Sequence, residues 1–96
     1  MARIELAPEL IDDIDRIILH LTENEVPHPE ARIHEIISAI DVLQQNPLIG
    51  RPVIEKNREL VIGRGTHGYI ALYRHLEQID TVFVLAIRAQ REAGYR

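Results

Sequence analysis

The chain has 96 residues, 46% of them hydrophobic and 27% charged, which predicts one folded domain over residues 1–96 and excludes a disordered chain. It contains no cysteine, which excludes disulfides and thiolate metal sites and fits a reducing cytosol. The net charge of −4 is uneven, because residues 1–50 carry three basic against ten acidic residues (−7) and residues 51–96 carry eight against five (+3). This asymmetry indicates a face that attracts anions or an acidic partner.

The first half of the chain predicts a short strand and two helices. Residues 2–6 alternate between apolar and polar, as a strand does. Pro8 and Pro29 each suit the first turn of a helix, and the helical spacing of apolar residues runs over 8–24 and 29–45. The apolar stripes comprise Leu10, Ile14, Ile17, Ile18 and Leu21, then Ile33, Ile36, Ile37, Ile40 and Leu43. The short link between them predicts an antiparallel hairpin. We expect neither a signal peptide nor a membrane anchor, because the N-terminus has no long apolar run.

The second half predicts three strands. "RELVIGR" (58–64), "GYIALYRH" (68–75) and "DTVFVLAIR" (80–88) are rich in β-branched and aromatic residues. Their short connections predict a three-stranded antiparallel meander packed on the helix hairpin, with the N-terminal strand joining the sheet. The expected fold class is therefore α+β.

The hexapeptide "GRGTHG" (63–68) has the letters of a dinucleotide-binding loop, but no helix is predicted after it. That motif must open a helix, so nucleotide binding is not expected. Instead, Gly65 and Gly68 are predicted to take the positive φ angles of a tight turn, and Gly63 to mark a bulge or a close backbone approach.

Strand alternation sorts the meander into two faces if the connections span 65–68 and 76–79. The face predicted to meet the helices collects Val61, Ile70, Leu72, Phe83, Leu85 and Ile87. The other face collects Arg58, Arg64, Tyr69, Tyr73, His75 and Arg88, with Leu60, Ile62, Val82 and Val84 between them. Exposed apolar area with arginine and tyrosine is typical of a partner surface. The alternative is that the C-terminal tail covers this second face.

Three segments, "NPLIGRPV", "RELVIGRGTHGYIALYRH" and "VLAIRAQREAGY", resemble the RelE/ParE superfamily of toxins from type II toxin–antitoxin (plasmid stabilisation) systems. The resemblance covers the whole chain and is most specific over residues 46–95. It implies a small cytoplasmic toxin without a cofactor, neutralised by a cognate antitoxin whose partly helical segment wraps it. A homodimer and a toxin–antitoxin heterotetramer both stay open.

The superfamily divides into two activities. RelE-like members cut messenger RNA in the ribosome with basic residues on the sheet, whereas ParE-like members poison DNA gyrase and need no bond-making residues. The lysines of the RelE-like pattern are absent here, since Lys56 is the only lysine, and Ala89 stands where related sequences carry a histidine. We therefore favour a ParE-like gyrase inhibitor that is not an enzyme. A ribosome-dependent ribonuclease and a non-toxic partner-binding relic remain the alternatives.

Two sets of site residues are predicted, the first from the second face of the meander and the second from this resemblance. For target or antitoxin binding we predict Arg58, Arg64, Tyr69, Tyr73, His75, Val84 and Arg88. If the chain is a ribonuclease, the candidates are Arg64, Arg88, Arg91 and Tyr95.

The remaining polar residues predict no further site. His20, His28 and His34 have no convincing metal-ligand spacing, so no metal is expected. The acidic residues Asp12, Asp13 and Asp15 are predicted to form a solvated face near a helix start.

Overall fold

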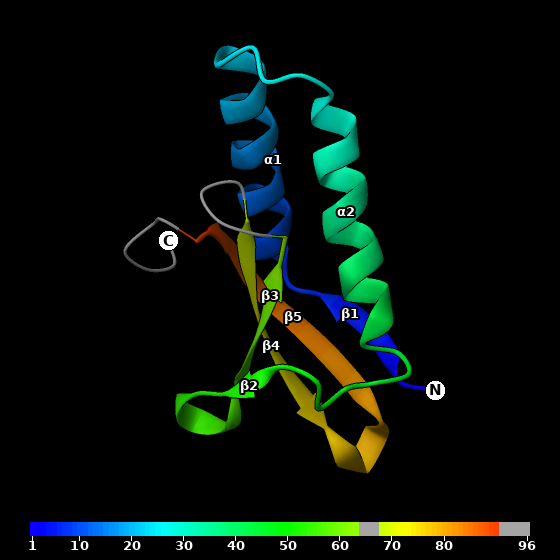
Figure 1. The fold of residues 1–96 in the computed structure, drawn as a ribbon. Coiled ribbons are helices and arrows are strands. Elements are labelled where there is room, and N and C mark those ends of the chain that lie inside the picture. The colour runs from blue at the N-terminus through cyan, green and yellow to red at the C-terminus, as the bar shows by residue number, and fades with distance from the viewer. Residues whose placement is uncertain (64–67, 91–96) are drawn as a thin grey trace.

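The computed structural model describes residues 1–63 and 68–90, in which a helix hairpin packs on one five-stranded sheet (Figure 1). The elements are β1 (Arg3–Leu6), α1 (Pro8–Glu23), α2 (Pro29–Val42), β2 (Arg51–Pro52), β3 (Arg58–Ile62), β4 (Tyr69–Leu76) and β5 (Thr81–Ala89). The predicted α+β class is confirmed. Both helices begin at the predicted prolines and end one and three residues earlier than expected, at 23 and 42.

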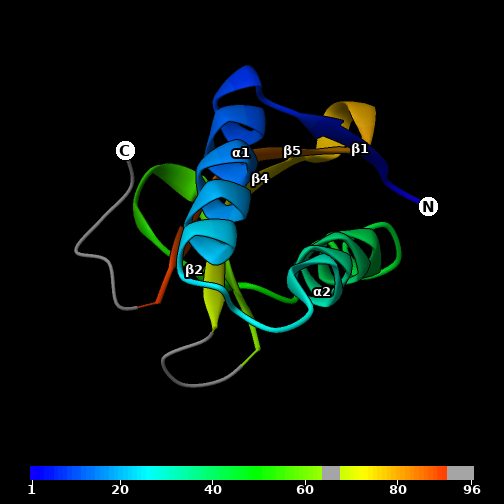
Figure 2. The same ribbon diagram turned by 90° about the horizontal axis from the view of Figure 1, so that it is seen from above.

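The sheet is mixed rather than purely antiparallel. Its strand order is β1-β5-β4-β3-β2, and β3, β4 and β5 form the predicted antiparallel meander. β1 joins the edge of the sheet as a parallel neighbour of β5, and the two-residue strand β2, which was not predicted, pairs with β3. Figure 2, the view from above, shows α1 and α2 beside each other. In Figure 1 the tip of their hairpin extends past the end of the sheet.

The helices cover the face of the sheet opposite to the one predicted. Tyr73, Val82 and Val84 are fully buried, and they pack in one cluster with Leu10 and Ile36 of the helices. Leu72 and Leu85, which were predicted to meet the helices, alternate with these residues and lie on the other side. The two sorted sets were both largely apolar, so alternation separated them without deciding which set faces inward.

The strand register also differs from the prediction. Ile62 pairs with Tyr69 instead of Ala71, a shift of two residues that leaves the faces unchanged. Between β4 and β5 the register shifts at Leu72/Tyr73, so that Leu85 becomes an extra residue in β5. Such a bulge reverses the alternation beyond it.

Beyond the bulge, Ile87 and Arg88 keep the sides that were predicted for them, although the rest of the two sets is reversed. Ile87 belongs to the core on the helix side, and Arg88 lies on the opposite face across from Ile70.

Side chains of α1 hold the strand next to this bulge. β1 pairs with β5 only as far as Val84, so the next backbone groups on that edge of β5 have no strand neighbour. Asp13 accepts a hydrogen bond from the Ile87 N–H at 2.9 Å, and Arg16 donates to the Ile87 carbonyl at 3.4 Å. Asp13 is 5% exposed, so its predicted place on a solvated face is wrong, whereas Asp12 and Asp15 are exposed as expected.

The glycine-rich connection differs in detail from its prediction. Gly63 has a φ of 75°, a conformation that glycine adopts without strain. Gly68, which was predicted to have a positive φ, does not, and Gly65 lies outside the described residues. The chain therefore leaves β3 through a left-handed glycine at position 63, two residues before Gly65, the first glycine for which a positive φ was predicted.

Candidate partner-binding face of the sheet

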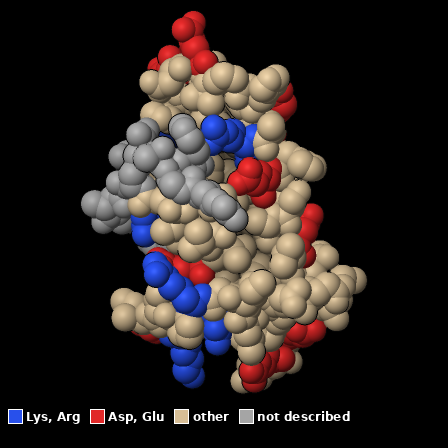
Figure 3. Space-filling view, viewed as in Figure 1, with Lys and Arg blue, Asp and Glu red and all other residues tan. Residues whose placement is uncertain are grey.

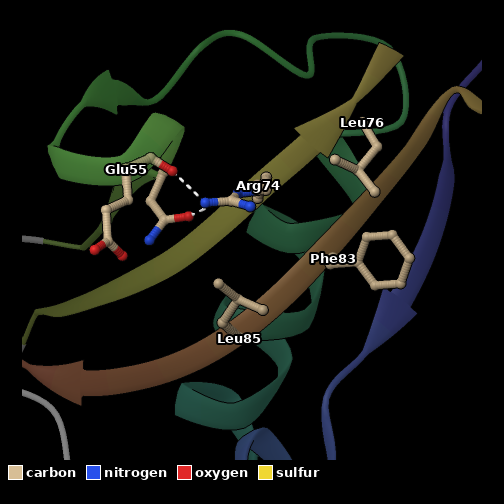
Figure 4. A pocket seen from close by; sticks show the side chains of 6 residues that line it. Glu55, Arg74, Leu76, Phe83 and Leu85 are labelled. Carbon is tan, nitrogen blue, oxygen red and sulfur yellow. Dashed lines mark hydrogen bonds between the residues drawn. The ribbon is translucent and has the colours of Figure 1, made fainter. Parts of the chain in front are cut away.

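The face of the meander opposite the helices is called the open face below. Its described members are Glu59 and Val61 of β3, Ile70, Leu72, Arg74 and Leu76 of β4, and Thr81, Phe83, Leu85, Ala86 and Arg88 of β5. Figure 4 shows several of these side chains in front of the strands, with a helix behind the sheet. The face is mainly apolar, and its described basic residues are two arginines.

A shallow depression of about 450 Å³ lies on the open face. Its residues are Glu55, Asn57, Arg74, Leu76, Phe83 and Leu85 (Figure 4). The last three supply an apolar floor. The first two belong to the segment between β2 and β3, which forms a 3-10 turn beside the sheet.

Arg74 is the cation of this depression. Its Nε donates a hydrogen bond to Asn57 Oδ1 at 3.1 Å, and its Nη2 donates to the main-chain carbonyl of Glu55. Both acceptors are neutral, and no carboxylate of residues 1–63 or 68–90 forms an ion pair with this guanidinium. In Figure 4 the Glu55 carboxylate points away from Arg74. The positive charge is therefore fixed in place without a counter-charge from the described chain.

The predicted partner surface of Tyr69, Tyr73 and Val84 is wrong, because these side chains lie in the core under the helices. Tyr73 fits there because its hydroxyl oxygen accepts a hydrogen bond from the Gly50 N–H at 2.8 Å. Burial raises the pKa of Tyr73 above its ordinary value of 10.0, although the Gly50 hydrogen bond and the nearby Arg58 charge act in the opposite direction.

Arg58 and His75, the other predicted residues on that side of the sheet, have structural contacts. Arg58 donates to the carbonyls of Leu48 and Gly50 at 3.1 and 2.8 Å, which holds the loop before β2. The His75 Nε2 lies 3.1 Å from an Asp80 carboxylate oxygen, and the His75 side chain is 11% exposed. Neither residue lies on the open face.

Arg88 is the predicted site residue that the described structure does place on the open face. It lies at the end of β5, where its Nη1 donates to the carbonyls of Ala89 and Gln90 at 3.2 and 3.3 Å. Arg64, Arg91 and Tyr95 lie outside the described residues.

Sequence reasoning missed Arg74, although a signal for it was present. Arg74 shares strand parity with Ile70 and Leu72, which were predicted to lie in the core. An arginine in that row argues against burying the face, because arginine is rarely buried without a partner. This position alone did not identify the open face, because the other predicted row carries Arg58 and Arg88.

The described residues contain no metal centre or membrane span. Within 1–63 and 68–90, no three His, Asp or Glu residues gather as a metal-binding group. No helix in this part of the chain has the length and apolar character needed to cross a membrane.

The fold, a helix hairpin on one face of a mixed five-stranded sheet, is shared with solved structures from toxin–antitoxin systems. A solved chromosomal ParDE TA system from P. aeruginosa has this fold, with a TM-score of 0.75 and 23% identity over 93% of this chain and 96% of that chain. The toxin–antitoxin complex RelBE2 from Mycobacterium tuberculosis matches with a TM-score of 0.60 and 22% identity over 93% and 98%. These two likenesses show the fold.

Sequence comparison identifies the family. Residues 4–94 match the model of the ParE toxin of the type II toxin–antitoxin system parDE. Toxin RelE3 from Caulobacter vibrioides is 29% identical over 92 residues, which cover 96% of this chain and 98% of that protein. The chain belongs to the ParE toxin family of type II toxin–antitoxin systems, and the predicted RelE/ParE resemblance is confirmed.

Proposed function

We propose that this toxin acts by inhibiting DNA gyrase and that a cognate antitoxin neutralises it. The supporting observation is the chemistry of the open face, whose described residues include no histidine, lysine or tyrosine. Cutting RNA through its ribose 2′-hydroxyl requires groups that remove a proton, stabilise charge and protonate the leaving oxygen. A mainly apolar face with two arginines supports a toxin that binds its target rather than one that breaks a bond.

The alternative is a ribosome-dependent messenger RNA endoribonuclease. Two observations favour it: the relative from Caulobacter vibrioides is named Toxin RelE3, and Arg88 lies on the open face, where a guanidinium stabilises phosphate charge. The other candidates for this activity, Arg64, Arg91 and Tyr95, lie outside the described residues.

An antitoxin partner is supported by the relatives. The matching structures from P. aeruginosa and M. tuberculosis are a ParDE TA system and a toxin–antitoxin complex, respectively. The open face of this chain offers apolar surface that a partner would remove from water.

The two activities are separated by assaying the purified toxin against both targets. We expect inhibition of DNA supercoiling by gyrase, relief of that inhibition by the antitoxin encoded beside the toxin, and intact messenger RNA on translating ribosomes. Cleavage of ribosome-bound messenger RNA with gyrase unaffected would reverse the assignment. In that case Arg88→Ala should slow cleavage roughly 10²-fold or more, because it removes a charge-stabilising group.

A further inference from the structure

The depression on the open face combines a charge with apolar surface. Arg74 is directly opposite Phe83 in the β4–β5 ladder, and Leu85 follows two residues later in β5. Opposed side chains of antiparallel strands have Cβ atoms roughly 4.5–5.5 Å apart. The guanidinium therefore stands beside the apolar floor, and a single ligand can touch both.

The charge of Arg74 is available to a ligand. A guanidinium carries five N–H donors, and the two neutral acceptors described above use two of them. Arg51 differs, because it already donates twice to Glu59 Oε1, at 3.0 and 2.7 Å. No carboxylate of the described chain has to be displaced before an anion binds Arg74.

The wall of the depression is preorganised by unusual backbone. Glu55 and Lys56 have φ angles of 60° and 65°, in the left-handed region that non-glycine residues seldom occupy. This conformation directs the Glu55 carbonyl toward Arg74 and fixes the guanidinium before any ligand arrives (Figure 4). Strained backbone of this kind concentrates at binding sites, where preorganisation lowers the entropy lost on association.

We propose that this depression receives an acidic, apolar segment of the antitoxin, with one carboxylate on Arg74 and a neighbouring aliphatic or aromatic side chain against Phe83 and Leu85. The assignment rests on the proposed function, which supplies the antitoxin. A planar carboxylate matches the guanidinium fork. A nucleic acid fits less well, because successive phosphates need several cations, whereas Arg74 is the one cation among the described residues that line the depression and the Glu55 carboxylate is exposed at the rim.

The test is calorimetric titration of the full-length toxin and two variants with the antitoxin encoded beside it, at low and high salt. Arg74→Met keeps the apolar stem and removes the charge, so antitoxin binding should weaken roughly tenfold or more at low salt and depend less on salt. Leu85→Ala removes apolar contact, so binding should weaken several-fold at both salt concentrations with an unchanged salt dependence.

Matched controls come from outside the depression. Arg32→Met removes an arginine of the helix α2, and Leu19→Ala removes an apolar side chain that is 58% exposed on α1. Both controls should bind the antitoxin as the unaltered toxin does. Circular dichroism and thermal melting of each variant establish that it is folded.

The other possible binding results each contradict either the depression as the antitoxin site or the proposed function itself. Unchanged binding by folded Arg74→Met and Leu85→Ala, with tight binding by the unaltered toxin, would overturn this site alone. Weakening by Leu19→Ala instead would move the partner to the hairpin. If Arg74→Met loses affinity for a single-stranded RNA oligonucleotide but not for the antitoxin, the depression binds nucleic acid. Absence of antitoxin binding by the unaltered toxin would overturn the proposed function together with this site.

Discussion

The Tyr73 hydroxyl is the polar tip of a side chain that is otherwise sealed in the core. It receives the Gly50 N–H, and Gly50 tolerates no side chain, because a Cβ there would lie 2.7 Å from the Tyr73 ring and 2.7 Å from the Glu59 carbonyl. Arg58 completes the arrangement by donating to the Gly50 carbonyl. Residues predicted to bind a partner are thus the ones that fix the loop between α2 and β2.

Tyr73→Phe tests this contact through stability and its pH dependence. The variant leaves the buried Gly50 N–H without its acceptor, which should cost about 1–3 kcal/mol of unfolding free energy. Because burial raises the folded-state pKa of Tyr73 above 10.0, the unaltered protein is stabilised below pH 10 and loses that contribution as pH rises through the raised value. Urea unfolding at pH 7 and above pH 10 should show the two proteins converging in alkali. A constant difference would contradict the role of the neutral phenol.

At the scale of elements, the junction between α1 and β5 decides which side chains the last strand presents. On its β1 side, β5 has no neighbouring strand beyond Val84. The Asp13 carboxylate accepts the Ile87 N–H there, in place of the backbone carbonyl that a neighbouring strand would supply. The bulge beside it turns Ile87 toward the helices and Arg88 toward the open face. A polar residue of the first helix therefore supports the part of β5 that places Arg88 on the open face.

Asp13→Ala should lower the unfolding free energy by about 1–3 kcal/mol, because it leaves the buried Ile87 N–H unpaired. Asp13→Asn keeps an acceptor oxygen and should lose less. Asp12→Ala, in the same turn but exposed, is the control and should stay within about 0.5 kcal/mol of the unaltered protein. Urea denaturation gives the free energies, and hydrogen exchange of the Ile87 amide reports the contact directly. Equal losses for both alanine variants would show that the Asp13 contact contributes no stability.

At the scale of the whole molecule, the sheet has one face under the helices and one largely apolar face on the other side, where Val61 is 53% exposed and Ile70, Thr81 and Ala86 are buried. Figure 3 shows acidic side chains at the tip of the hairpin and along the right side of the molecule, and basic ones mainly at the lower left, the region of β2 in Figure 1, with a further basic group in the upper middle. The acidic half of the sequence contains both helices, and the basic half contains the meander. The sign of the charge near the sheet agrees with an acidic partner there.

The choice of inner face predicts opposite outcomes for two similar truncations. Ile36→Ala, in the core and 0% exposed, should cost about 2–5 kcal/mol of unfolding free energy. Val61→Ala, on the open face and 53% exposed, should change it by about 0.5 kcal/mol or less. Chemical denaturation of both variants measures the difference. A Val61→Ala loss as large as that of Ile36→Ala would mean that the open face is covered in the isolated toxin.

Local pattern was sufficient for both helices, the N-terminal strand and the meander, although not for the two-residue strand β2. Pro8 and Pro29 with their apolar stripes marked the two helices, and β-branched runs marked the meander, because helix and strand periodicity act over a few neighbouring residues. The family resemblance also depended on local segments, and the family match over residues 4–94 confirms it. These features do not require knowledge of how the layers stack.

The candidate site needed the tertiary structure, for three physical reasons. Two apolar faces of one sheet look alike in sequence, and the helices select between them by packing, with Tyr73 fitting only where Gly50 meets its hydroxyl. The bulge at Leu85 reverses alternation through a contact with Asp13, more than 70 residues away in sequence. Arg74 becomes a candidate binding residue because a strained turn, distant in sequence, holds its guanidinium with neutral oxygens. By itself, the sequence determined the family, the elements and the meander, since these arise from local periodicity and motif. The inner face, the bulge and the available charge depend on contacts between distant segments, and only the tertiary structure decided them.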